Sequence, residues 1–435
     1  MKATTFHSLT SVALGVGAMQ LQTPLYSSYS FNPLQHLAGI APYYEPADPP
    51  RDPNPPQGCT VTRAAYLVRH AAINANDFDY EQYLQPFLYK LGNATVDWAK
   101  IPQLSFLAVW EPPSFSEQEL LTRTGKVEAG QLGLSISYRY PKLKLPQRVW
   151  TSTAERTVQS ARGFVRGLEM DDNTINLVEI PEGKEDGADS LTPYKSCKGY
   201  TAAAGAEQQR KYVDLYTAPI IARLKSLAPG FNFTSDDVTA MQAMCGYDTV
   251  IRGSSPFCST DLFSPDEWLQ FEYGQDIHLF SGGNDVNATM PLDQINYNRA
   301  WVSSRILPFL TNIAIERMNC SANHAVAAAQ GRNMSSSPSA TTYYRVLLNR
   351  SPQVLPGCFD GPGQSCSAKV LPAFLQQRAD MFRNYSAVCG NTYKNSTDAV
   401  TFYTNSNNGT VVGKKRHLMC LISGKSPLTN TGVLD

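Results

Sequence analysis

The sequence predicts an α/β protein: a three-layer, mainly parallel sheet with helices on both faces, plus a smaller inserted α-helical domain. Two observations support this class. Between residues 65 and 180, short runs with β character alternate with stretches of helical periodicity, which is typical of parallel strands connected by helices. Between residues 201 and 275, apolar residues recur at helical spacing, so this segment is expected to form the helical insertion.

The α/β region begins with a strand that ends in two polar residues. Ala65–Val68 is an apolar run with β character, and it stops abruptly at Arg69 and His70. Helices are then expected at Tyr80–Leu91 and at Thr122–Tyr138, the second starting with a hydroxyl that can cap it. The polar pair is therefore expected at the carboxyl end of a strand, where open α/β sheets usually bind their ligands.

A second unit of strand, helix and strand follows. Strands are expected at Val149–Trp150 and Ile175–Ile180, with a helix at Ala154–Glu169 between them. Arg156 lies in the first turn of this helix, where backbone N–H groups and the helix dipole already favour an anion. A cation at this position needs a partner there, which could be a bound phosphate or a nearby carboxylate.

The N-terminus is expected to be a secretory signal peptide, residues 1–19, because Lys2 precedes a short apolar stretch. An ordinary buried helix is the alternative. The other expected boundaries are a Pro-rich N-terminal extension at 20–58, the α/β domain at 59–200 and 276–390, the helical insertion at 201–275, and a tail expected to be disordered at 391–435.

The charge balance excludes some classes of partner. The chain has 37 Lys and Arg residues against 37 Asp and Glu residues, so neither a nucleic-acid-binding surface nor a polybasic membrane surface is indicated. No apolar run reaches the ~18 residues needed to span a bilayer. Any positive field is therefore expected to be local to one pocket.

Three segments, in order, resemble the histidine acid phosphatases, the branch of the phosphoglycerate mutase-like fold that includes the fungal phytases. Arg69 and His70 match the start of the motif Arg-His-Gly-x-Arg-x-Pro, whose Gly, second Arg and Pro are replaced here by Ala71, Ile73 and Ala75. The other two segments are Leu121–Gly133, where Glu128 replaces a Gln of the family pattern, and Val149–Ala161. The resemblance also implies strands within Trp301–Cys320 and Tyr343–Asn349.

The resemblance implies a phosphomonoester hydrolase of acid phosphatase or phytase type, with a small phosphorylated substrate and no cofactor. His70 would attack phosphorus and become a phosphohistidine, while Arg69 and Arg156 would bind the phosphate oxygens in the bidentate geometry that Arg favours. Ile73 cannot take the place of the lost Arg. A carboxylic acid would then protonate the leaving alcohol.

The resemblance does not supply that proton donor. The family carries a late His-Asp motif, or His-Arg-Glu in a small fungal subgroup, and neither occurs here; His278 is followed by Leu279 and Phe280. Glu272–Phe280 is too short for the usual helix, loop and strand, which predicts a deletion near Asp276 to His278. The alternative function is therefore a catalytically impaired or inactive secreted glycoprotein of the same fold. An intracellular mutase is a third reading, but it would need neither disulfides nor glycans.

The cysteines and glycosylation sequons favour an extracellular protein, either secreted or held at the cell wall. No Cys-x-x-Cys is present and no His lies at zinc-ligand spacing, so a metal site is not expected. Spacing and the resemblance together imply the pairs Cys59–Cys320, Cys197–Cys389, Cys245–Cys258 and Cys358–Cys366, leaving Cys420 over. Asn-x-Ser/Thr sequons occur at Asn93, Asn232, Asn287, Asn319, Asn333, Asn349, Asn384, Asn395 and Asn408.

Overall fold

The computed structural model describes most of the chain between residues 31 and 390. The described residues are 31–45, 51–114, 117–169, 174–180, 191–202, 204–280, 290–321, 341–382 and 384–390. The expected signal peptide at 1–19 and the expected tail at 391–435 lie outside them, as does Cys420.

Two hydrogen-bonded sheets form the β part of the molecule. In the larger sheet the strand order is β1-β4-β5-β6, and β7 also pairs with β5. The smaller sheet contains β2 and β3. The bounds are β1 Cys59–Val68, β2 Arg148–Ser152, β3 Asn176–Ile180, β4 Asn312–Cys320, β5 Thr341–Leu348, β6 Ser351–Gln353 and β7 Cys366–Ser367.

The α/β class with a helical insertion is confirmed, but the strand directions differ from the expectation of a mainly parallel sheet. Among the described strands only β2 and β3 pair in parallel, and every pair in the larger sheet is antiparallel. The reason lies where β4 enters the sheet. The Arg69 amide donates to the Thr311 carbonyl at 2.9 Å and the Leu310 amide donates to the His70 carbonyl at 3.1 Å. Thus β4 starts where β1 ends and must run back along it.

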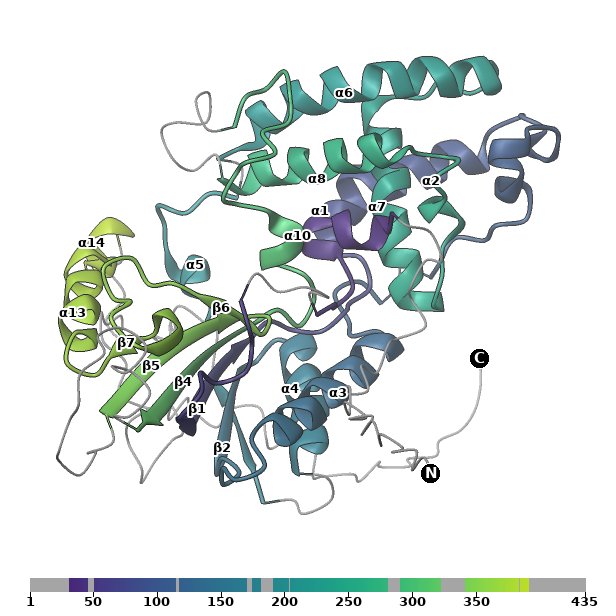
Figure 1. The fold of residues 1–435 in the computed structure, drawn as a ribbon. Helices are drawn as coiled ribbons and strands as arrows, with labels where there is room; N and C mark the ends of the chain where they lie inside the picture. The colour runs from purple at the N-terminus through teal and green to yellow at the C-terminus, as the bar shows by residue number, and fades with distance from the viewer. Residues whose placement is uncertain are drawn as a thin grey trace, which may run out of the picture.

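Helices α3 (Arg123–Arg139) and α4 (Glu155–Glu169) lie side by side next to β1 and β2 (Figure 1). As expected, the Thr122 hydroxyl caps α3, accepting from the Gly125 amide at 3.0 Å. The two helices approach closely because glycines face each other. A Cβ atom placed on Gly167 would lie only 1.9 Å from the Gly130 carbonyl oxygen, so no larger residue fits there without a shift of the backbone.

A separate set of helices forms the part of the molecule above the sheets in Figure 1, and its buried residues form the largest apolar cluster described. Helix α7 lies at its centre with nearly every residue buried, and it begins with a capping box of Thr234 and Asp237. The bounds are α1 Asp77–Asp79, a π-helical turn Tyr80–Leu84, α2 Gln85–Gly92, α6 Ala206–Leu227, α7 Ser235–Arg252 and α8 Pro265–Phe280. Helix α8 continues across the predicted boundary between residues 275 and 276.

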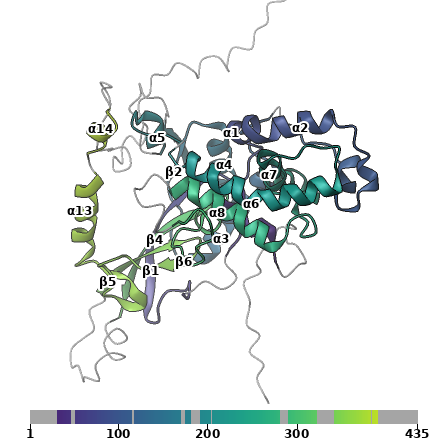
Figure 2. The ribbon, with the colours of Figure 1, turned by 90° about the horizontal axis from the view of Figure 1, so that it is seen from above.

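Short helices complete the described part. Figure 2 shows α13 and α14 beside the β5 side of the larger sheet, away from α6, α7 and α8. Their bounds, with the other short helices, are α5 Pro193–Ser196, α10 Ser303–Ile306, α13 Leu371–Phe382 and α14 Tyr385–Val388. The 3-10 turns are Pro33–His36, Ala38–Ile40, Trp98–Lys100, Pro102–Ala108, Pro256–Cys258 and Pro362–Gln364.

Four disulfides tie these elements together, and they are the four pairs that the sequence and the resemblance implied. Cys59–Cys320 joins β1 to β4, and Cys197–Cys389 joins the residue after α5 to the residue after α14. Cys245–Cys258 and Cys358–Cys366 close short loops. Among the described helices, none combines the length and the apolar character needed to cross a bilayer.

Candidate active site

The side chain of Arg69 is anchored immediately after β1. Its Nη1 donates to the carbonyl oxygens of Gly39, at 2.6 Å, and of Leu307. The guanidinium carbon lies 5.0 Å from the centre of the Phe309 ring, a cation–π geometry. Burial lowers the pKa of Arg69 to about 10, an effect that Tyr247 opposes and the nearby Arg156 reinforces. Arg69 therefore remains a fixed cation in acidic and neutral solution.

His70 is held as a neutral imidazole with one nitrogen free of backbone contacts. Its Nδ1 lies 2.9 Å from the Ala71 carbonyl oxygen. Because a carbonyl can only accept, Nδ1 carries the proton and the lone pair lies on Nε2. Burial lowers the pKa of His70 to about 3, and the positive charges of Arg69 and Arg156 act in the same direction. The ring is therefore neutral, with its one proton on Nδ1, across most of the acid range.

Arg156 lies in the first turn of α4, as predicted, and its partner is the carboxylate of Glu119, with which it forms an ion pair. Of the two partners expected from the sequence, the structure thus contains the carboxylate. Glu119 adopts a φ of 63°, a left-handed conformation that is unusual for a residue other than Gly. Both side chains keep some exposure, 21% for Arg156 and 32% for Glu119, so the pair is accessible to a solute.

The replaced motif positions form apolar packing. Ala71, Ile73 and Ala75 are buried, and Ile73 forms an isolated β-bridge with Leu121. The Ala71 amide donates to the Ser160 hydroxyl at 2.9 Å, which fixes the loop after His70 onto α4. Ile73 therefore contributes apolar packing at this position.

A polar network links this strand end to the helical part, and the sequence did not indicate it. Tyr247 on α7 donates to Asp79 at 2.5 Å, and Asn76 donates to Asp79 at 2.8 Å. Burial raises the pKa of Asp79, and the hydrogen bonds from Tyr247 and Asn76 oppose that rise. Burial raises the pKa of Tyr247, and the positive charge of Arg69 opposes that rise. The network is therefore electrostatically coupled to Arg69, one of the candidates for binding phosphate. No local pattern identifies Tyr247, which lies in a helix buried along its length.

His278, the late histidine considered for the missing acid motif, lies on α8. It is about half-buried, which lowers its pKa, and Asp79 opposes that effect. Its Nδ1 has no hydrogen-bond partner among the described residues. The segment from Glu272 to Phe280 is helical throughout, and the structure places no strand in it.

The structure corrects one of the predicted glycosylation sites. Asn349 is 2% exposed. Its amide oxygen accepts from Thr311 at 2.9 Å and from the Asn312 amide at 2.8 Å, and its nitrogen donates to the Arg305 carbonyl at 3.0 Å. A glycan would break these bonds. Asn93, Asn232 and Asn384 are exposed and Asn319 is half-buried, whereas Asn287, Asn333, Asn395 and Asn408 lie outside the described residues.

Residues 76–290 match the family described as histidine phosphatase superfamily (branch 2). The chain therefore contains a histidine phosphatase superfamily (branch 2) domain over these residues. The match begins after His70, so the roles of Arg69 and His70 depend on the motif and on the geometry described above.

Named relatives are fungal. A thiamine-repressible acid phosphatase of Schizosaccharomyces pombe is 32% identical over 278 residues, which are 58% of this chain and 58% of the relative. A phytase of Candida albicans is 25% identical over 413 residues, covering 82% of this chain and 87% of that protein. The crystal structure of the phytase from D. castellii superposes with a TM-score of 0.71 at 23% identity, covering 90% of this chain and 94% of that chain. The last likeness shows the shared fold.

Proposed function

We propose that the chain is a secreted phosphomonoester hydrolase of acid phosphatase or phytase type that acts through a phosphohistidine at His70. The observation that carries this proposal is the state of His70, a neutral imidazole whose Nδ1 is bonded to the Ala71 carbonyl oxygen at 2.9 Å beside the fixed cation Arg69. A neutral Nε2 next to a guanidinium is suited to attack a phosphate that the guanidinium binds.

The reaction proceeds in two displacements at phosphorus. Nε2 of His70 forms a bond to phosphorus while the bond to the ester oxygen breaks, and the leaving alcohol takes a proton. Water then attacks the phosphohistidine, which releases inorganic phosphate and regenerates the imidazole. Arg69 and Arg156 neutralise the equatorial oxygens, and for this Arg156 exchanges at least part of its contact with Glu119 for the substrate.

The two candidate functions differ in whether the leaving group can obtain a proton. The family's late acid motif is absent, so substrates that need no protonation should react best. This favours aryl phosphates, whose phenolate leaves readily, over alkyl phosphates such as glycerol 2-phosphate. The alternative, a catalytically impaired or inactive glycoprotein of the same fold, is favoured by the apolar packing of Ile73 at the position of an arginine.

The test is hydrolysis of an aryl phosphate and an alkyl phosphate by the purified full-length protein from acid to neutral pH. His70→Ala is the active-site variant. His36→Ala is the matched control, because His36 contacts Glu272 at 3.3 Å and takes no part in the site. Aryl phosphatase activity that survives in His36→Ala and disappears in His70→Ala supports the proposal. Equal activity in all three proteins overturns the role of His70, and no activity in any of them favours the inactive glycoprotein.

Secretion is supported by the four disulfides and by exposed sequons. We expect the protein to be recovered from the medium of an expressing fungal culture, with its N-terminus processed and its mass lowered by endoglycosidase. An unprocessed, unglycosylated protein found only inside cells would favour the intracellular mutase reading instead.

A further inference from the structure

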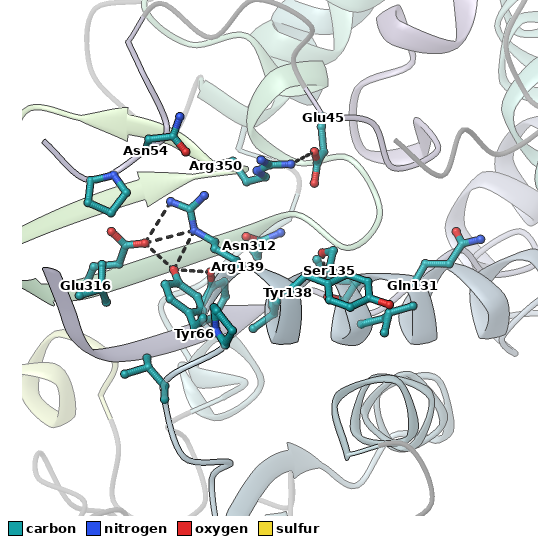
Figure 3. Close-up of a pocket in the computed structure, with 18 of the residues that line it drawn as sticks. Glu45, Asn54, Tyr66, Gln131, Ser135, Tyr138, Arg139, Asn312, Glu316 and Arg350 are labelled. Carbon is teal, nitrogen blue, oxygen red and sulfur yellow. Dashed lines mark hydrogen bonds and ion pairs between the residues drawn. The ribbon is translucent and has the colours of Figure 1, made fainter. Parts of the chain in front are cut away.

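A cavity of about 560 Å³ lies outside the proposed catalytic site (Figure 3). One wall is a stripe of α3 in which Glu128, Leu132, Ser135 and Arg139 recur at helical spacing. The facing wall is the sheet, with residues from β1 and β4, and the third wall is the N-terminal segment around Glu45. Neither Arg69, His70 nor Arg156 lines it. Its volume lies in the range of pockets that hold small molecules.

Glu128 is the unusual residue of this cavity. It is 3% exposed, and neither carboxyl oxygen has a hydrogen-bond partner among the described residues. A buried polar group without a partner is costly. The carboxyl group therefore lacks a hydrogen-bond donor or a positive charge beside it, and a ligand could supply either.

Apart from Lys142, the other charged side chains of the cavity wall already have partners. Glu45 is paired with Arg350, and Glu316 with Arg139 at 3.1 Å; the same contacts appear as dashed lines in Figure 3. Lys142 is exposed at the rim. Among the buried groups of the wall, the uncompensated acid is therefore Glu128, and the preferred ligand charge next to it is positive.

The remaining surface suits the body of an organic cation. Tyrosine rings line the cavity from three segments of the chain; in Figure 3 Tyr138 lies beside Ser135, and Tyr66 lies near Glu316. Aromatic faces attract organic cations and pack against flat or aliphatic groups. The lining tyrosines are Tyr43, Tyr44, Tyr66, Tyr138 and Tyr140. Tyr138 is exposed at the rim, and the hydroxyls of Tyr66 and Tyr140 are hydrogen-bonded to each other.

We propose that this cavity binds a small organic amine, whose ammonium group pairs with Glu128 and whose apolar body lies against the tyrosine rings. The site is separate from the phosphate site, and the inference does not depend on the proposed hydrolase activity.

The proposal is tested with two probes of similar shape that differ in one terminal group. Tyramine carries an ammonium group where tyrosol carries a hydroxyl, so their difference in affinity measures the contribution of the charge. We expect isothermal titration calorimetry of the full chain at neutral pH to give at least ~10-fold tighter binding of tyramine, the size of one charge-assisted contact. Glu128→Gln should abolish this difference, whereas the exposed Glu111→Gln should retain it.

A proton count gives a second readout. Burial raises the pKa of Glu128 to about 8, with no contribution from the charged residues that line the cavity with it, Glu45, Arg139, Lys142, Glu316 and Arg350. The carboxyl group is therefore mostly protonated at pH 7, and pairing with an ammonium should release its proton. The measured heat should then vary with the ionisation enthalpy of the buffer in the native protein and not in Glu128→Gln.

A cavity-filling variant keeps the test decisive if Glu128→Gln folds poorly. Ser135→Phe leaves Glu128 in place and fills the space, so it should lose both probes. Equal affinity for tyramine and tyrosol, or tyramine binding that persists in Ser135→Phe, overturns the proposal. The absence of binding by either probe at millimolar concentration also overturns it.

Discussion

At the scale of single residues, His70 determines how the proposed site should respond to pH. Its pKa is lowered to about 3, whereas a free His titrates near 6.5. We expect an NMR titration of the ring, assigned by comparison with His70→Ala, to show a midpoint near 3. The folded state binds this proton less readily than the unfolded chain, so His70 makes unfolding easier as pH falls from about 6.5 towards 3. A midpoint near 6.5 would contradict the buried, cation-flanked environment.

Glu119 should set how strongly Arg156 binds phosphate. The Glu119 carboxylate is ion-paired with the Arg156 guanidinium. It would also lie close to a phosphate dianion bound there, so the carboxylate and the phosphate compete for Arg156 and repel each other. Glu119→Gln should therefore lower the inhibition constant of inorganic phosphate several-fold. The measurement is competitive inhibition of aryl phosphate hydrolysis, with Glu111→Gln as the exposed control. A higher inhibition constant would show that Glu119 instead holds Arg156 in its binding orientation.

Local motifs in the sequence pointed to some residues of the candidate site and could not point to the residues that pair with them. Arg69, His70 and Arg156 could be predicted because each occurs within a recognisable segment at a strand end or a helix start. Glu119 and Tyr247 could not, because each reaches the site through folding of a distant segment: Glu119 from the loop before α3 and Tyr247 from a buried helix. Pairings of that kind depend on tertiary packing, which one sequence does not display.

At the scale of elements, the contact between α3 and α4 depends on glycine. Gly167→Ala should destabilise the protein by about 3 kcal/mol, because the added Cβ would meet the Gly130 carbonyl at 1.9 Å and the helices would have to separate. Gly92→Ala, also in a helix, meets nothing within 4 Å and should be neutral or stabilising by up to about 0.5 kcal/mol. Urea unfolding of both variants checks this, and equal stabilities would contradict it.

The positions of the helices and strands were largely predictable from the sequence, whereas the relative directions of the paired strands were not. The sequence placed α3 and α4 within one or two residues of their observed bounds. For α3 the capping Thr122 marked the start, and for α4 the apolar stripe of an amphipathic helix marked its length. A short apolar run such as Ala65–Val68 identifies a strand without showing which neighbour it pairs with. The antiparallel pairing of β1 with β4 depends on the link between His70 and Leu310, which is distant in sequence.

At the scale of the whole molecule, the strands are divided between two sheets. Among the described residues, β1 pairs with β4 and β2 pairs with β3, and no hydrogen-bonded ladder joins β1 to β2. β1, β2 and β3 therefore each have one edge without a described strand partner. Unpaired backbone groups and the exposed side chains of Leu67, Ile313 and Ile315 on the larger sheet are costly features that proteins normally cover.

This arrangement gives the hypothesis of a deletion near Asp276 to His278 a physical consequence. An additional segment at this point could supply a strand for an open edge of β1 or β2, together with the missing proton donor. We expect cDNA sequenced across the junction to contain an in-frame insertion, and the longer chain to unfold at a higher temperature and to hydrolyse alkyl as well as aryl phosphates. An intact junction would contradict the hypothesis. The division between the two sheets would then belong to the native fold, and activity restricted to substrates with good leaving groups would be its expected consequence.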